Sequence, residues 1–193
     1  MITNCYLKQL LEGNKRFVKG ELSQKNIIGD RTKTAYEPNP YAIILTCSDS
    51  RVPPEIIFDE SLGRLFVIRV AGNIVDEITV ASIEFGLIQF KIKFILVLGH
   101  EDCGAVKAAT TKLNISSNLD KVIDLISPSI PEYNHIIDDC DSLSTVIKLN
   151  VQNQINNCLE KSKIIKDLYS KNEIEIMGGF YKITSGEVVF FDN

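Results

Sequence analysis

The sequence predicts an α/β fold, a single domain with a mostly parallel central β-sheet of four or five strands flanked by helices. Three apolar runs of strand length, 41–46, 64–70 and 93–99, lack alternation, which is typical of strands buried on both faces. Between the second and third runs, the apolar spacing in 76–90 fits a largely buried helix better than a strand. Strand, helix and strand in this order indicate parallel pairing.

The other expected elements are inferred from the spacing of apolar residues and from the positions of proline and glycine. An amphipathic helix is expected over 4–18, and a polar connector over 20–40, so that 1–40 forms an N-terminal helical arm and connector. A helix should follow Cys103, and 112–140, with its prolines, should be irregular. One or two helices are expected over 142–172, a strand over 173–179 and a C-terminal hairpin over 180–191, turning at Ser185 and Gly186.

Size and composition agree with one domain over 1–193. The chain has 45% hydrophobic and 24% charged residues, enough for one filled core. Its net charge of -4 and the absence of a basic patch argue against nucleic acid as a partner. No secretory signal and no apolar run of about 18 residues is seen, so we expect a cytoplasmic protein without a membrane partner. Five widely spaced cysteines favour thiol or metal chemistry over a disulfide framework.

Reactive side chains follow two of the predicted strands. The first strand is followed by Cys47, Asp49 and Arg51, and the third by His100 and Cys103. Functional groups in open parallel sheets gather beyond the carboxyl ends of strands, so the two sets meet if the strands are neighbours. Two thiols with an imidazole and a carboxylate are ligands that Zn²⁺ prefers over Mg²⁺ or Ca²⁺. The sequence therefore predicts a zinc site.

Other interpretations of these residues are weaker. Either cysteine alone would more often be a small buried hydrophobe, and Asp49 with Arg51 an ordinary ion pair. The spacing from Cys47 to Arg51 is too short for a cysteine phosphatase loop, and "HEDC" is not a Cys-x-x-Cys redox pair. The glycines of "GHEDCG" are followed by alanine instead of lysine, which disfavours a nucleotide site. A second metal site formed by His135 and Cys140 is a weaker hypothesis, because His135 is expected in a surface loop.

Several ordered blocks carry a family resemblance. The stretches "CSDSRVPPE", "LFVIRVAGN", "SIEFG" and "ILVLGHEDCGAV" resemble those of the β-class carbonic anhydrases, and the similarity extends over most of the chain. The resemblance implies one Zn²⁺ per chain held by Cys47, His100 and Cys103, with Asp49 and Arg51 as the catalytic dyad. It also implies reversible hydration of CO₂ to bicarbonate and a proton by zinc-bound hydroxide.

The resemblance implies three further properties. Phe66, Ala71, Phe85 and Gly104 should line the CO₂ pocket. Asp49 could instead bind zinc in a closed, inactive state, and the sequence leaves open or closed undecided. The family forms dimers with a shared pocket, so we expect a homodimer or a dimer of dimers.

Two alternatives to CO₂ hydration remain from the sequence. The same site could hydrolyse CS₂ or COS, which are similar linear molecules. The protein could instead be a zinc-stabilised, non-catalytic binding or regulatory module, because Pro38 stands where the family commonly carries a glutamine that positions substrate.

Overall fold

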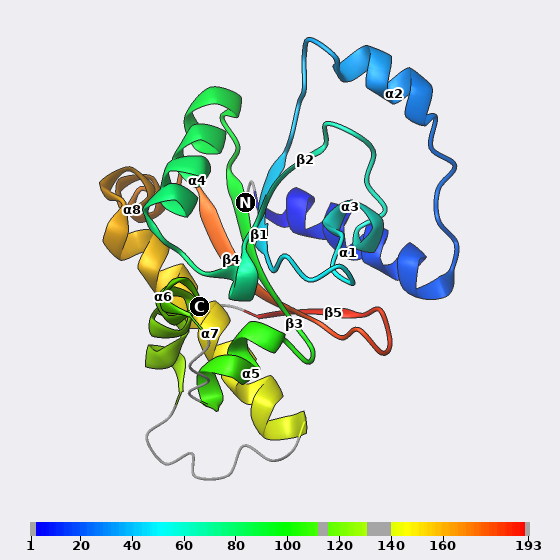
Figure 1. Cartoon of the computed structure of the whole chain (residues 1–193). Helices are drawn as coiled ribbons and strands as arrows, with labels where there is room; N and C mark the ends of the chain where they lie inside the picture. The colour runs from blue at the N-terminus through cyan, green and yellow to red at the C-terminus, as the bar shows by residue number, and fades with distance from the viewer. Residues whose placement is uncertain (1–2, 112–115, 131–139, 192–193) are drawn as a thin grey trace.

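The sheet is the centre of the fold. The computed structural model describes residues 3–111, 116–130 and 140–191, whose strands form one five-stranded sheet in the order β2-β1-β3-β4-β5 (Figure 1). Four strands are parallel, and the fifth is antiparallel to β4. Their bounds are β1 Ala42–Thr46, β2 Leu65–Arg69, β3 Phe94–His100, β4 Glu175–Tyr181 and β5 Val188–Phe191. The predicted single-domain α/β fold is confirmed.

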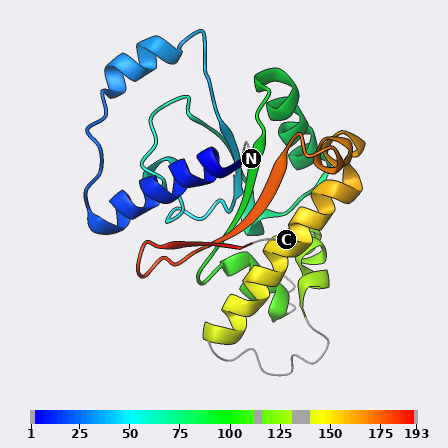
Figure 2. The same cartoon turned by 180° about the vertical axis from the view of Figure 1, so that it is seen from behind.

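Helices cover both faces of the sheet (Figures 1 and 2). One face is covered by α1 and α3, and the other by α4, α7 and α8. The α5 and α6 helices pack with α7 in a third apolar cluster next to the strand ends. The helix bounds are α1 Thr3–Lys19, α2 Ile27–Thr34, α3 Pro54–Ile57, α4 Glu77–Phe90, α5 Gly104–Thr110, α6 Ser117–Ile126, α7 Cys140–Lys161 and α8 Lys163–Ser170, with short 3₁₀ turns η1 Ala71–Asn73 and η2 Ser127–Ser129.

Burial of the two central strands on both faces explains their continuous apolar runs. In β1, Ile43 and Leu45 face the α4 and α7 side, while Ala42 and Ile44 face the α1 side. Successive side chains in a strand point to opposite faces, so a strand covered on both sides needs apolar residues throughout. The β3 strand follows the same rule and is buried over its whole length.

The neighbouring positions of β1 and β3 bring their carboxyl ends together. Thr46 is in register with Leu98, and the Thr46 hydroxyl donates a hydrogen bond of 2.9 Å to the Leu98 carbonyl. Cys47 comes directly after β1, and His100 is the last residue of β3. The condition that the sequence left open, that these two strands be neighbours, is therefore met.

The β2 strand and the α4 helix are less buried than expected. Because β2 lies at the edge of the sheet, its residues are half-buried or, at Arg69, exposed. The α4 helix packs one face on the sheet, but Ile78, Phe85 and Ile88 on its other side are 74%, 54% and 60% exposed. The prediction of burial on both faces of β2 and around most of α4 is wrong for the single chain.

Two further segments differ from the prediction. The polar connector contains α2, which has no buried residue and which begins where the Asn26 side chain accepts a hydrogen bond from Gly29 N. The described part of 112–140 is helical, because Ser116 caps the start of α6 and Pro128 stands after its end. His135 lies outside the described residues, as do the rest of 131–139. No helix in the described ranges combines the length and apolar character that crossing a membrane requires.

The C-terminal hairpin forms as predicted. Gly186 adopts a positive φ of 77° in the turn between β4 and β5, and its N–H donates to the Lys182 carbonyl at 2.8 Å. Asn14 of α1 donates to the Gly186 carbonyl and accepts from Val188 N, at 2.8 and 2.9 Å. The N-terminal helix is thereby attached to the hairpin.

Candidate metal centre

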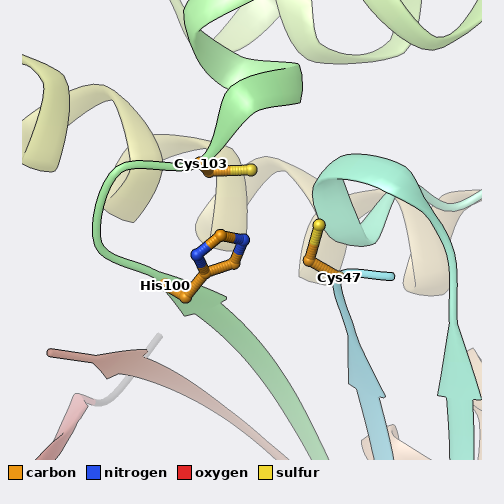
Figure 3. Close-up of side chains that lie close together, drawn as sticks. All are labelled: Cys47, His100 and Cys103. Atoms are coloured by element: carbon orange, nitrogen blue, oxygen red, sulfur yellow. The ribbon is translucent and has the colours of Figure 1, made fainter. Parts of the chain in front are cut away.

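Three side chains converge beyond the carboxyl ends of β1 and β3 (Figure 3). Cys47 follows β1, His100 ends β3, and Cys103 stands at the N-cap of α5. Their sulfur and imidazole nitrogen atoms lie within 4.8 Å of one another, and all three residues are buried. Figure 3 shows the two sulfurs and the imidazole ring pointing toward one another.

The orientation of the His100 ring leaves one nitrogen facing the cluster. The Nδ1 atom lies 2.9 Å from the Glu101 carbonyl, which can only accept, so Nδ1 carries the proton. The Nε2 atom then has a lone pair, and it is buried without a hydrogen-bond partner among the described residues. A buried polar atom without a partner is costly and calls for a ligand. A metal ion satisfies this nitrogen, and a carbonyl bound to the other nitrogen is the usual support of a metal-binding histidine.

The two thiols share one proton. Hydrogen bonds from Cys103 and from the Gly72 N–H, 3.4 Å from the Cys47 sulfur, outweigh the opposing effect of burial and lower the pKa of Cys47 to about 4. The pKa of Cys103 is raised, because Cys103 keeps that hydrogen bond to the thiolate and is buried. We attribute both shifts to one coupled pair, which releases its first proton easily and its second with difficulty. A divalent metal would replace the second proton.

The geometry fits zinc. Bonds of about 2.3 Å to sulfur and about 2.0 Å to nitrogen put tetrahedral ligand atoms about 3.5 to 3.8 Å apart, slightly closer than the 4.8 Å limit of the cluster. Small side-chain adjustments suffice to close this difference. Two thiolates and an imidazole suit Zn²⁺ better than a hard cation.

Asp49 and Arg51 form a forked ion pair beside the cluster. Arg51 donates from Nε to Oδ1 at 3.0 Å and from Nη2 to Oδ2 at 2.8 Å, and its backbone N–H donates to Oδ1 at 2.9 Å. The hydrogen bonds from Arg51 hold the pKa of Asp49 well below its usual range. Asp49 is therefore an anion whose two oxygens are both engaged by Arg51.

Two residues that sequence reasoning did not assign to the site support its loops. Arg69, paired with Thr46 in the sheet register, donates to the carbonyls of Cys47 and Asp49 at 3.2 and 2.5 Å. Asp102 accepts from Arg51 through its backbone carbonyl at 3.4 Å. The arginine at the end of β2 was the available signal for the first contact, whereas the second depends on how the two loops meet.

The predicted pocket residues fall into two sets. Phe66 of β2 and Phe85 of α4 pack together, with ring centroids 6.2 Å apart. Ala71 precedes Gly72 in η1, and Gly104 follows Cys103 as the exposed first residue of α5. The two phenylalanine rings thus lie side by side, and Ala71 and Gly104 belong to segments that contact the Cys47, His100 and Cys103 cluster.

Comparisons with known proteins give a consistent result. A family model described as carbonic anhydrase matches residues 42–188. Carbonic anhydrase 2 of Mycobacterium tuberculosis is 32% identical over 194 residues, which cover 96% of this chain and 91% of the relative. The solved β-carbonic anhydrase CcaA has a TM-score of 0.76 at 27% identity, covering 97% of this chain and 88% of its own. A tetrameric β-carbonic anhydrase of Sordaria macrospora has a TM-score of 0.75 at 26% identity, covering 97% and 92%.

Proposed function

The chain belongs to the β-class carbonic anhydrases, lyases whose function is the reversible hydration of CO₂, and we propose that it works through one zinc ion bound by Cys47, His100 and Cys103. The observation that carries this proposal is the buried cluster itself, with a histidine nitrogen that has no partner in the described part of the chain. Zinc in such a site, with a fourth position open, supplies Lewis acidity that can lower the pKa of a water from about 15.7 to about 7.

Asp49 orients the attacking water in this proposal. Its carboxylate accepts a hydrogen bond from the water and so directs the oxygen lone pair toward the carbon of CO₂. This role needs an ionised carboxylate with a fixed direction. Arg51 supplies both, because its fork binds the two carboxylate oxygens and keeps the pKa of Asp49 low.

The Arg51 fork also bears on whether the site is open or closed. Asp49 would have to give up its charge-assisted hydrogen bonds to Arg51 in order to become a fourth zinc ligand. We therefore propose that the open state is the favoured one in this protein. Arg69 supports this state by binding the backbone carbonyl of Asp49, which limits movement of the loop.

The substrate is apolar and offers little to hydrogen-bond, so its pocket should be apolar as well. We propose that Phe66, Ala71, Phe85 and Gly104 line this pocket, as the family resemblance implies. In the single chain Phe85 is 54% exposed, so a partner chain is needed to enclose the pocket at this side.

We propose that the functional unit is a homodimer, alone or as half of a tetramer. The α4 helix is apolar on its exposed side as well as on its packed side, and a helix that is apolar all round is usually buried. The α2 segment adds Ile27 and Ile28, which are 64% and 71% exposed. The tetrameric relative from Sordaria macrospora is consistent with self-association. A cytoplasmic location stays a prediction from the sequence.

The proposed function is tested by stopped-flow CO₂ hydration from pH 6 to 9 on the zinc-loaded protein and on Asp49→Ala. We expect a rate well above buffer for the unmutated protein and a decrease of about 10²- to 10⁴-fold for the variant, with zinc content unchanged. Zinc-loaded, folded protein without activity toward CO₂ would contradict the proposal. Parallel assays with CS₂ and COS would then distinguish a hydrolase from a non-catalytic module.

A further inference from the structure

Two amide side chains are buried in the middle of α7. Asn150 and Gln154 are both 0% exposed and lie one helical turn apart, on a helix whose nearby core residues are apolar. Burying amides is unfavourable unless their donors and acceptors find partners. In this protein the two side chains also bind each other, Gln154 Nε2 donating to Asn150 Oδ1 at 2.9 Å.

The other hydrogen bonds of the pair reach the segment 72–75, which follows β2. Asn150 Nδ2 donates to the Gly72 carbonyl at 2.9 Å, and Gln154 Oε1 accepts from the backbone N–H of Val75 at 2.8 Å. Gln154 Nε2 donates further to the Leu125 carbonyl, at 3.0 Å. Both ends of the segment are therefore held by α7, and the pair is in turn held by the end of α6.

The held segment has an unusual backbone. Gly72 and Asn73 both have positive φ, 68° and 47°. The positive φ favours glycine at this position, and a Cβ atom there would also lie 2.7 Å from Ile126 Cδ1, which would have to move. Asparagine is among the few other residues that tolerate the left-handed region. A conformation of this kind persists only where surrounding contacts stabilise it.

The same glycine contacts the candidate metal centre. The Gly72 N–H donates to the sulfur of Cys47 at 3.4 Å, while the Gly72 carbonyl accepts from Asn150. One residue thus connects the α7 amides to a ligand sulfur. We propose that Asn150 and Gln154 are positioning residues for Cys47, which hold η1 so that the Gly72 N–H fixes the orientation of this sulfur toward zinc. The inference rests on the proposed zinc site.

Partners that orient a metal ligand affect metal affinity. Their loss typically weakens metal binding by about 10- to 100-fold, even though they do not contact the ion. A purely structural role of the α7 amides would lower stability without a selective effect on the metal. The two roles can be separated, because α7 carries another amide for which no bond to the segment 72–75 is found: Asn153 donates to the Leu125 carbonyl at 3.3 Å.

The test compares Asn150→Leu with Asn153→Leu. Each change removes one amide from α7, but only the first removes the bond to Gly72. Zinc affinity is measured by competition with a chromophoric chelator, thermal stability by circular dichroism, and the environment of the ligand sulfurs by ¹¹³Cd NMR of the cadmium-loaded proteins. Exchange of the Gly72 amide hydrogen in the metal-free proteins is followed by NMR. If Asn150→Leu does not fold, Asn150→Ser with Asn153→Ser as control replaces the pair.

We expect about 10- to 100-fold weaker zinc binding, a shifted ¹¹³Cd resonance and faster Gly72 exchange in the Asn150 variant alone. Equal effects of the two substitutions on zinc affinity, or unchanged protection of the Gly72 amide in the Asn150 variant, would overturn the inference. Absence of zinc binding in the unmutated protein would instead refute the proposed function. The amide exchange still decides in that case whether Asn150 holds Gly72.

Discussion

Arg51 donates two hydrogen bonds to the carboxylate of Asp49, from Nε to Oδ1 and from Nη2 to Oδ2, although only one residue separates the two in the sequence. The backbone N–H of Arg51 adds a third bond to the same carboxylate. Because the loop turns tightly at this point, the carboxylate is oriented by the next residue but one. Only a planar guanidinium can hold both oxygens in this way.

Arg51→Lys should therefore reduce activity while the metal stays bound. Lysine keeps the positive charge but binds as a point donor, so Asp49 would lose its fixed direction and could turn toward the metal. We expect CO₂ hydration to fall by about 10- to 100-fold, with zinc content unchanged by elemental analysis. Lys166→Arg on the exposed side of α8 is the control and should leave the rate unchanged. An undiminished rate in Arg51→Lys would show that the fork is not needed.

Cys103→Ser should remove zinc, whereas Cys158→Ala should not. Both cysteines are buried, but Cys103 belongs to the candidate metal centre, and Cys158 lies in the core against the sheet. Burial raises the pKa of Cys158 to about 12, so it stays a neutral thiol. We expect the affinity for zinc to fall by more than about 100-fold in Cys103→Ser, since a ligand matters more than its outer partners. Full zinc occupancy of Cys103→Ser in competition with a chelator would contradict the assignment.

The central strands and the convergence of the candidate site residues were predictable because their sequence signals are local. An unbroken apolar run such as 93–99 reports burial on both faces within a few residues. The candidate ligands Cys47 and His100 stand directly at the ends of such runs, so a single assumption, that β1 and β3 are neighbours, was enough to bring them together. The hairpin turn at Gly186 was equally local, because glycine supplies the positive φ.

Features that depend on distant contacts were not predicted. The sequence of β2 resembles that of the central strands, but its place at the sheet edge is decided by the whole topology. Likewise, nothing near Asn150 in the sequence indicates a bond to Gly72, 78 residues away. The α2 and α6 helices were missed for another reason. Their N-cap residues, Asn26 and Ser116, are of types that are also common in loops. They therefore do not by themselves indicate a helix in a segment that is otherwise polar or contains proline.

Ile88→Glu should dissociate the proposed homodimer. Ile88 is 60% exposed on the outer side of α4, and a charge placed there would be buried without a partner in the interface. We expect the mass in solution, measured by light scattering after size-exclusion chromatography, to fall to that of one chain, and activity to fall with it if the pocket is shared. Ile164→Glu on α8, where the side chain is 39% exposed, is the control. A monomeric unmutated protein would refute the interface.

Asp59 should make the attachment of the N-terminal arm sensitive to acid. Its side chain is 0% exposed and binds Arg16 of α1 and Lys25, at 2.5 and 2.9 Å, with a further bond of 2.6 Å from the Ser23 hydroxyl. Burial by itself would raise the pKa of Asp59, but the hydrogen bonds from Ser23, Lys25 and Arg16 outweigh it and leave the pKa lowered. A lowered pKa in the folded state means that the ionised carboxylate stabilises the fold.

The sign of this effect sets the pH range of the test. The contribution of Asp59 is complete above the ordinary aspartate pKa of about 3.9 and is lost as the pH falls through the lowered value. Asp59→Asn keeps the size of the side chain and tolerates the positive φ of 49°, so it removes mainly the charge. We expect a loss of about 1.5 to 3 kcal/mol in the free energy of unfolding by urea at pH 7, and a smaller difference at pH 3.

Asp167→Asn, which breaks an exposed ion pair with Lys163, is the control and should have no measurable effect at either pH. A difference between Asp59→Asn and the unmutated protein that stays constant down to pH 3 would mean that the carboxylate charge does not hold the arm, because a contribution from ionisation must disappear when the proton binds.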